Sequence, residues 1–409
     1  MDTPNRRAFL GLAALSVAAP ACAWDPHTSP ATSPATSDKA RHEVGTALPI
    51  LPVQGVSPEL AVPSGAAQDS TWGREWDDVV VAAKREGTLS LLTVVGRGYR
   101  NMIERFEQAF PGVSVHHVAE SSPAVWLGTA RQARRANTAA FDVALVQPDR
   151  ALAEGGPEGM WAPLKPLLVH PEVLAGEVWR DGMHARFLDV RGILCFDWEY
   201  QVVHAYAINS DLVQPDEIKS VMDLLDPKWK GKILSSDPRL GTGMLSAASI
   251  ARSWGTDVLK RLLVDQRPTF SPEAGRAVTE PLVRGQYPIA LGVRPKALQE
   301  FRDQGLGHTV TFLDLPDADF TATLSLLYFD RAPHPAAAAL FANWILTQEG
   351  QTILTRSLPT NSARTDVQAF EPDGIGAPDK PYYEPDRETN HGHTASTQRF
   401  ITSLLGRRP

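Results

Sequence analysis

The stretch "LLDPKWKGKILSSDPRLGTGM", residues 224–244, joins a short apolar run to a turn that contains two glycines. The run that begins at Ile233 predicts a buried strand, and a helix is expected to start at the Gly-Thr-Gly sequence. This strand-to-helix order is typical of an open α/β sheet, in which ligands bind outside the carboxyl ends of the strands. The stretch therefore predicts one side of a ligand-binding cleft.

Length and charge limit the class of protein. The chain has 409 residues, of which 43% are hydrophobic. A single core rarely grows beyond about 250–300 residues, so two lobes are expected. The net charge of -7 and the pI near 5.9 argue against a nucleic-acid-binding surface, which needs a clustered basic excess.

The N-terminus "MDTPNRRAFLGLAALSVAAPACAW" has the pattern of an export signal. Arg6 and Arg7 precede an apolar run shorter than the roughly 20 residues that span a bilayer. Residues 1–23 therefore predict a signal peptide of the twin-arginine type and a periplasmic or other extracytoplasmic location. Two processing routes stay open: cleavage by an ordinary signal peptidase, or lipidation of Cys22, for which Ala19 departs from the usual Leu.

Cys195 is the one cysteine in the body of the mature chain under either processing route. An intramolecular disulfide is therefore excluded even in an oxidising compartment. In "GILCFDW" this residue is expected to be a small buried apolar side chain rather than a reactive thiol.

Composition and periodicity divide the chain into segments. Residues 24–70, with "TSPATSPATS", predict a disordered tether. From residue 71 the order helix, strand, helix, strand, helix, strand indicates an open, mostly parallel sheet with buried strands. A second α/β unit follows. We expect lobe 1 in 71–203 with about 308–350, lobe 2 in 204–307 with about 351–366, and a wrapping or mobile C-terminal extension in 367–409.

Six segments, read in order, resemble the extracellular solute-binding proteins of ABC importers, in the branch that includes ferric-iron-binding and 2-aminoethylphosphonate-binding proteins. The resemblance covers roughly residues 72–366. The segments are "WDDVVVAAKREGTLSLLTVV", "FEQAFPGVSV", "FDVALV", "VMDLLDPKWKGKILSSDP", "VRGQYPIAL" and "APHPAAAALFANWILTQEGQTIL".

The resemblance implies a type II periplasmic-binding-protein-like fold, in which two α/β lobes are joined by crossing strands and close on a small solute. It also implies an inner-membrane ABC permease and ATPase as partners. We expect a monomer with no cofactor. Enzymatic activity is not expected, because the sequence contains no nucleophile elbow, zinc signature or phosphate loop with a lysine.

Candidate ligand-binding residues follow the predicted strands of the first lobe. Free N–H groups at a helix start favour anions, and short polar groups there hydrogen-bond small solutes, although each can equally serve as a turn or helix cap. Tyr200 is expected to line the hinge with Glu199 and Gln201. The first-lobe candidates are Gly96, Arg97, Tyr99, Ser121, Ser122, Gln147, Asp149 and Tyr200.

The second lobe contributes the junction quoted at the start and the junction "ALGVRPKAL". Arg239 and Arg294 can bind an anion through their guanidinium groups, and the Gly-Thr-Gly turn can donate main-chain and hydroxyl hydrogen bonds. A plain structural turn is the alternative interpretation. The second-lobe candidates are Asp237, Arg239, Gly241, Thr242, Gly243 and Arg294.

Iron is the alternative ligand. Ferric-binding members of the resembled branch use two adjacent tyrosines near the second of these junctions, where this chain has Gly292-Val293-Arg294-Pro295. The pair Tyr382-Tyr383 lies in the predicted tail beyond the body, as does "NHGH", which is expected to be solvated. The sequence therefore favours a small anion, such as a phosphonate, phosphate ester or organic acid, over bare iron. A sensor input domain or an enzyme on the same fold is a further alternative.

Overall fold

The computed structural model describes residues 71–377 and 380–406, with the side chains of the first two left out. These residues belong to one compact unit. The predicted signal peptide, Cys22 and the predicted tether lie outside the described residues. None of the described helices is long and apolar enough to cross a membrane.

The first sheet has six strands in the order β2-β1-β3-β13-β4, with β5 also paired to β13. Its first three strands are parallel, and β13 runs antiparallel to its neighbours. The run Leu89–Leu92 is buried because both faces of β1 are covered, as its continuous apolar pattern indicates. The strands are β1 (Thr88–Val94), β2 (Ser114–Glu120), β3 (Val143–Val146), β4 (Trp161–Ala162), β5 (Cys195–Asp197) and β13 (Ser325–Phe329).

Helices surround this sheet. The most buried is α9, whose residues from Ala337 to Leu346 are all buried, and the rings of Phe341 and Trp344 pack against Phe106. Cys195 is fully buried in β5, as predicted. The helices are α1 (Thr71–Glu86), α2 (Gly98–Ala109), α3 (Pro123–Arg135), α4 (Pro148–Arg150), α5 (Pro171–Leu174), α9 (Pro335–Leu346) and α10 (Gln348–Ser357).

The second sheet has five strands in the order β11-β7-β10-β8-β9. The pairs β10–β8 and β8–β9 are parallel, whereas β7 runs antiparallel to β10 and β11. Its strands are β7 (Tyr206–Asn209), β8 (Ile233–Ser236), β9 (Thr269–Ser271), β10 (Ile289–Leu291) and β11 (Val310–Phe312). Its helices are α6 (Gly241–Lys260), α7 (Arg276–Val283) and α8 (Pro295–Arg302).

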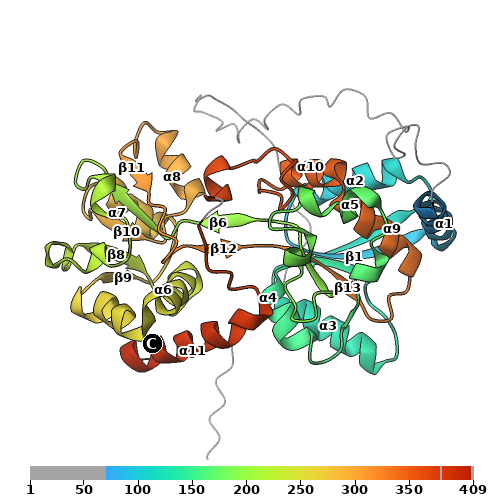
Figure 1. The fold of residues 1–409 in the computed structure, drawn as a ribbon, viewed down its shortest axis with the longest axis horizontal. Coiled ribbons are helices and arrows are strands. Elements are labelled where there is room, and N and C mark those ends of the chain that lie inside the picture. Colours follow the sequence, from blue (N-terminus) through green and yellow to red (C-terminus); the bar gives the residue numbers. More distant parts are fainter. Residues whose placement is uncertain (1–70, 378–379, 407–409) are drawn as a thin grey trace, which may run out of the picture. The chain divides into compact units, whose positions relative to one another are not determined.

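Two short strands connect the sheets. β6 (Gln201–Val203) and β12 (Phe320–Ala322) pair antiparallel and run between the two sheets (Figure 1). The structure thus confirms a mixed α/β fold with helix-flanked sheets and crossing strands. The last helix is α11 (Glu388–Leu405).

Two segments belong to a different lobe from the one expected from the sequence. β11 pairs with β7 in the second sheet, whereas residues from about 308 were expected in the first lobe. α10 packs against α2 and α9 of the first sheet, whereas residues from about 351 were expected in the second lobe. Contacts between segments that are about a hundred residues or more apart decide such assignments, and local periodicity carries no information about these contacts.

Candidate functional site

The first junction follows β1. α2 begins at Gly98, directly after the exposed Arg97. A Cβ atom at Gly98 would lie 1.9 Å from the backbone oxygen of Ser357, and one at Gly96 would lie 3.1 Å from the ring of Tyr99. Both glycines therefore allow the start of α2 to pack closely against the end of α10.

Tyr99 lies at the start of α2 and is fully buried. Its hydroxyl has no hydrogen-bond partner among the described residues. Burial and the charge of Glu199 raise the pKa of Tyr99 above its usual value. An unpartnered buried hydroxyl is costly, so this phenol lacks the compensating contact that most buried hydroxyls have.

Four further first-lobe candidates lie at the starts of α3 and α4, and Tyr200 directly precedes β6. Ser122 is the N-cap residue of α3, and its side chain makes no capping hydrogen bond. Ser121, Gln147 and Asp149 are exposed. The ring of Tyr200 lies 4.3 Å from the guanidinium carbon of Arg180, which makes a cation–π contact.

Three carboxyl groups, Asp197, Glu199 and Asp386, gather where the crossing strands leave the first sheet; we call them the hinge acids. The hydroxyl of Thr323 donates to Asp197 and to the backbone oxygen of Glu199, and Thr360 donates to the Glu199 carboxylate. Burial raises the pKa of Asp197 to about 6 and that of Glu199 to about 7. Desolvation therefore outweighs the hydrogen bonds that stabilise the charged forms.

Asp386 comes from the C-terminal segment. Burial, together with the charges of Asp149, Asp197 and Glu199, raises the pKa of its carboxyl well above the usual value, although the backbone of Thr323 donates to it. The segment after residue 380 thus places a carboxyl group within electrostatic reach of Asp149. Sequence reasoning missed Asp197 and Asp386, because nothing in their local sequence marks them as buried.

The second-lobe junction forms an internal ion pair. The Nε of Arg239 donates to Asp237 Oδ1 at 2.8 Å and its Nη2 donates to Oδ2 at 2.9 Å. Its Nη1 lies 3.4 Å from the backbone oxygen of Gly406. The guanidinium is therefore largely engaged by the protein. A Cβ at Gly243 would lie 2.6 Å from the backbone oxygen of Asp237, so this glycine permits the tight turn into α6.

The helices α6, α7 and α8 of this lobe all start without a side-chain cap. α6 begins at Gly241 after Leu240, with Thr242 half-buried, and α8 begins after Arg294, which is exposed. Gly292 precedes this arginine with a φ of +98°, in a conformation that favours glycine. Arg97, Arg239 and Arg294 share no hydrogen-bond partner in the part of the chain that the structure describes.

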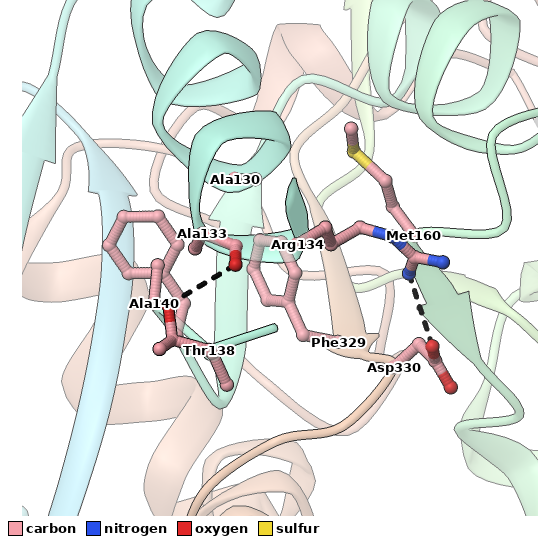
Figure 2. Close-up of a pocket in the computed structure, with 10 residues that line it drawn as sticks. Ala130, Ala133, Arg134, Thr138, Ala140, Met160, Phe329 and Asp330 are labelled. Atoms are coloured by element: carbon pink, nitrogen blue, oxygen red, sulfur yellow. Dashed lines mark hydrogen bonds and ion pairs between the residues drawn. The ribbon is translucent and has the colours of Figure 1, made fainter. Parts of the chain in front are cut away.

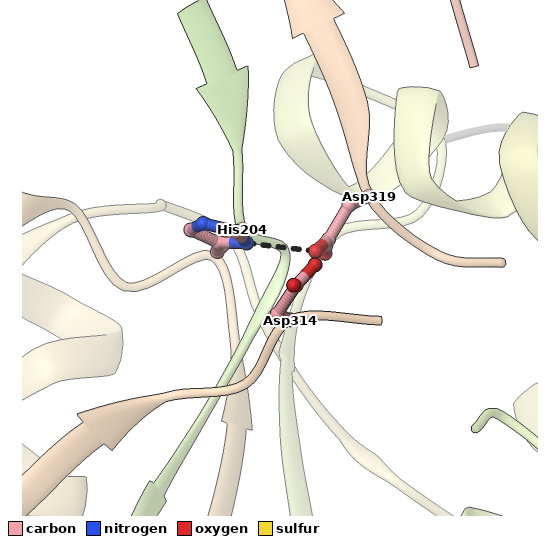
Figure 3. A group of neighbouring side chains, drawn as sticks. All are labelled: His204, Asp314 and Asp319. Carbon is pink, nitrogen blue, oxygen red and sulfur yellow. Dashed lines mark hydrogen bonds and ion pairs between the residues drawn. The ribbon is translucent and has the colours of Figure 1, made fainter. Parts of the chain in front are cut away.

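His204, Asp314 and Asp319 form a group that could be considered for a metal ion (Figure 3). His204 Nδ1 lies 2.8 Å from Asp319 Oδ2, and Nε2 lies 3.0 Å from the backbone oxygen of Asp373. Both ring nitrogens thus face oxygen atoms, an arrangement that favours the doubly protonated ring. Burial lowers the pKa of His204, but the hydrogen bond to Asp319 and nearby charges outweigh it and raise the pKa overall. A protonated ring cannot ligate a metal.

This group attaches the C-terminal segment instead. Lys380 Nζ lies 2.6 Å from Asp314 Oδ2, and the Tyr382 hydroxyl donates to Asp314 Oδ1 at 2.9 Å. Tyr382 and Tyr383 are both buried, and the backbone oxygen of Tyr383 accepts a hydrogen bond from Thr321 of β12. The expectation that these tyrosines lie beyond the body is therefore wrong.

The histidines of "NHGH" are also part of the body. His391 and His393 are half-buried in α11, and His393 Nε2 lies 2.9 Å from the backbone oxygen of Ala248. The expectation of solvated histidines is wrong, because α11 packs along α6.

A shallow pocket lies at the opposite end of β3 from the junctions (Figure 2). It is bordered by Arg134, Phe141, Met160 and Phe329. The Arg134 guanidinium already donates to the backbone oxygen of Gly159 at 2.7 Å and to Asp330 at 3.1 Å. This pocket therefore offers no free charged group to a solute.

Comparisons with solved structures show the fold. Iron-bound HitA from Pseudomonas aeruginosa is 18% identical, with 77% of this chain and 99% of that chain covered and a TM-score of 0.55. Trichodesmium IdiA (FutA) with iron and citrate is 17% identical, with coverage of 78% and 100% and a TM-score of 0.61. AfuA from Actinobacillus pleuropneumoniae with fructose-6-phosphate is 17% identical, with coverage of 78% and 98% and a TM-score of 0.50.

No curated protein matches the sequence. The family model described as bacterial extracellular solute-binding protein matches residues 97–357, which is more than half of the chain. This match begins at the first junction, directly after β1, and includes the other strands of both sheets and both crossing strands. The chain therefore belongs to the bacterial extracellular solute-binding proteins.

Proposed function

We propose that the protein is the solute-binding component of an ABC import system that captures a small anionic solute between its lobes. The observation that carries the proposal is the exposed Arg294 at the uncapped start of α8, directly after β10. Arg97 occupies the equivalent position before α2 in the other lobe. A guanidinium and the positive end of a helix dipole both favour a carboxylate, phosphonate or phosphate.

The mechanism is hinge closure about β6 and β12. A solute that contacts groups from both lobes stabilises the closed arrangement by the difference between its affinities for the two states. The protein acts as a periplasmic monomer that delivers its solute to an inner-membrane permease, and the binding needs no catalytic step.

The test begins with a thermal-shift screen of the mature protein against phosphonates, phosphate esters, sulfonates, carboxylates and ferric chelates, because a specific ligand raises Tm. Once the screen has identified a ligand, calorimetry compares the affinity of the parent protein for it with that of the double variant Arg294→Ala, Thr242→Val. We expect loss of measurable binding with an unchanged far-UV circular dichroism spectrum. Lys260→Ala, which removes one exposed positive charge at the far end of α6, serves as the control. Unchanged affinity in the double variant would refute this site.

A ferric chelate is the second candidate, favoured by the structural likeness to iron-binding proteins. An iron–citrate complex is itself an anion and suits the same cationic groups. Direct ligation by the tail tyrosines is disfavoured because their hydroxyls bond Asp314 and Thr394. The hydroxyl of Tyr99 is free of such partners among the described residues.

A visible charge-transfer band on addition of ferric citrate tests this candidate, since phenolate is a hard ligand suited to ferric iron. We expect Tyr99→Phe to abolish such a band and Tyr382→Phe to retain it. No band with the parent protein, or a band that survives in Tyr99→Phe, would argue against ligation by Tyr99.

A further inference from the structure

α11 is anchored to the first lobe at its start. The Nη1 and Nη2 atoms of Arg387 donate to the backbone oxygens of Phe187 and Ala185 at 3.2 and 2.9 Å. The backbone N–H of Glu388 donates to Leu188 at 3.0 Å, and its carboxylate accepts from the Val190 N–H at 2.8 Å. Phe187 and Leu188 belong to the apolar cores of the first lobe.

The same helix is anchored to the second lobe along the rest of its length. Ile401 is fully buried in the core of that lobe, with Phe400 and Leu404 packed against it. Arg252 of α6 donates to Asn390 Oδ1 at 3.0 Å, and His393 bonds the backbone of Ala248. α11 runs from the region of α4 to α6 (Figure 1).

A helix bonded to both lobes restricts their rotation. Crossing strands such as β6 and β12 bend at their ends, whereas an 18-residue helix with internal hydrogen bonds keeps its length. The lobes can therefore change their angle only if one anchor of α11 is released. The first-lobe anchor is the smaller, since it consists of hydrogen bonds at one end of the helix, whereas the second-lobe anchor includes buried apolar side chains.

We propose that α11 is an interlobe brace, and that release of the Arg387 and Glu388 anchor sets how far the lobes open. Truncation of Arg387 removes its two hydrogen bonds to the first lobe, together with its ion pair to the neighbouring Glu384, and leaves the second-lobe packing intact. The brace restricts lobe motion whatever the solute is, so its test does not depend on the proposed ligand.

Interlobe distances in the full chain test the brace. Spin labels are attached through Val81→Cys on α1 and Leu306→Cys after α8, both exposed, in a Cys22→Ser background; the native Cys195 is buried and does not react. The parent is expected to give one narrow distance distribution, and Arg387→Ala a broader distribution shifted to longer distances. Amide hydrogen exchange at Val190 and Glu388 is expected to rise roughly tenfold.

Arg399→Ala is the matched control, because Arg399 lies on the same helix and is exposed; its distances and exchange are expected to equal those of the parent. Glu388→Ala replaces Arg387→Ala if the latter fails to fold, and carries the same expectations. A distance distribution identical to that of the parent in the folded anchor variant would overturn the brace. A lower Tm with unchanged distances would overturn it too, since α11 would then only stabilise the fold.

Discussion

At the scale of single residues, the hinge acids show how burial changes chemistry. Asp197, Glu199 and Asp386 carry raised pKa values chiefly because of desolvation. The Nη1 atom of Arg186 lies 3.2 Å from Asp197 and supplies a countercharge. Glu199 has hydrogen bonds rather than an ion pair among the described contacts. Its charged form is thus less compensated than that of Asp197.

The stability of the protein should therefore fall as pH rises across the Glu199 titration. The folded-state pKa of about 7 lies above the ordinary 4.5, so the folded state holds the proton more tightly and loses stability between about pH 4.5 and 7. Glu199→Gln keeps an acceptor for Thr360 and removes the charge. We expect urea unfolding to show a gain on the order of 1–3 kcal/mol at pH 8 and little change at pH 4.5.

The exposed Glu177 provides the control for this measurement. Glu177→Gln is expected to follow the pH profile of the parent. A gain for Glu199→Gln that is the same at pH 4.5 and pH 8 would mean that desolvation of its charge is not the cause.

At the scale of elements, the start of α2 depends on a close contact with the end of α10. The two helices are separated by about 240 residues in the chain, and Asn101 Nδ2 donates to Ser357 Oγ at 2.6 Å beside Gly98. Glycine is unfavourable inside a helix relative to alanine. At Gly98, the close packing against α10 matters more than the low helix propensity of glycine.

Two glycine-to-alanine substitutions separate these effects. Gly98→Ala is expected to destabilise the fold by roughly 1–3 kcal/mol, because the new Cβ would lie 1.9 Å from Ser357 O and the backbone must shift. Gly128→Ala in α3, where nothing lies within 4 Å, is expected to stabilise it by about 0.5–1 kcal/mol. Chemical denaturation measures both. The contact would be unimportant if both variants gained stability.

At the scale of the whole molecule, the C-terminal segment joins parts that the sequence separates. Tyr382 bonds Asp314, the backbone of Tyr383 bonds β12, and His204 bonds the backbone of Asp373. These contacts attach Asp373, Tyr382 and Tyr383 to β12 and to residues near the crossing strands. The segment therefore belongs to the hinge region rather than to a tail.

Tyr382→Phe tests this attachment. The hydroxyl donates to Asp314 and accepts from the Ala377 N–H at 3.0 Å, so its removal is expected to cost about 1–2 kcal/mol and to increase amide exchange at Ala377 and in residues 380–383. Tyr287→Phe, which removes an exposed bond to Thr269, should cost less than about 0.5 kcal/mol. Equal costs in the two variants would show that the attachment contributes nothing beyond an exposed hydrogen bond.

Much of the fold could be predicted from the sequence. The apolar run at Leu89 and the glycine turn at residue 241 mark strand-to-helix junctions through local periodicity and turn chemistry, and the resemblance to solute-binding proteins agrees with the family match. The junction residues could be named as candidates for the same reason, because strand ends are local features.

What the sequence by itself determined was the class of fold, the family and the positions of the strand ends, since these depend on neighbours within a few residues. Only the tertiary structure decided that Arg239 is engaged by Asp237, that Asp386 joins Asp197 and Glu199, and that α11 contacts both lobes. The physical reason is that burial and partner choice come from contacts between distant segments. The local sequence around a polar side chain does not show whether the folded protein buries that side chain or leaves it solvated.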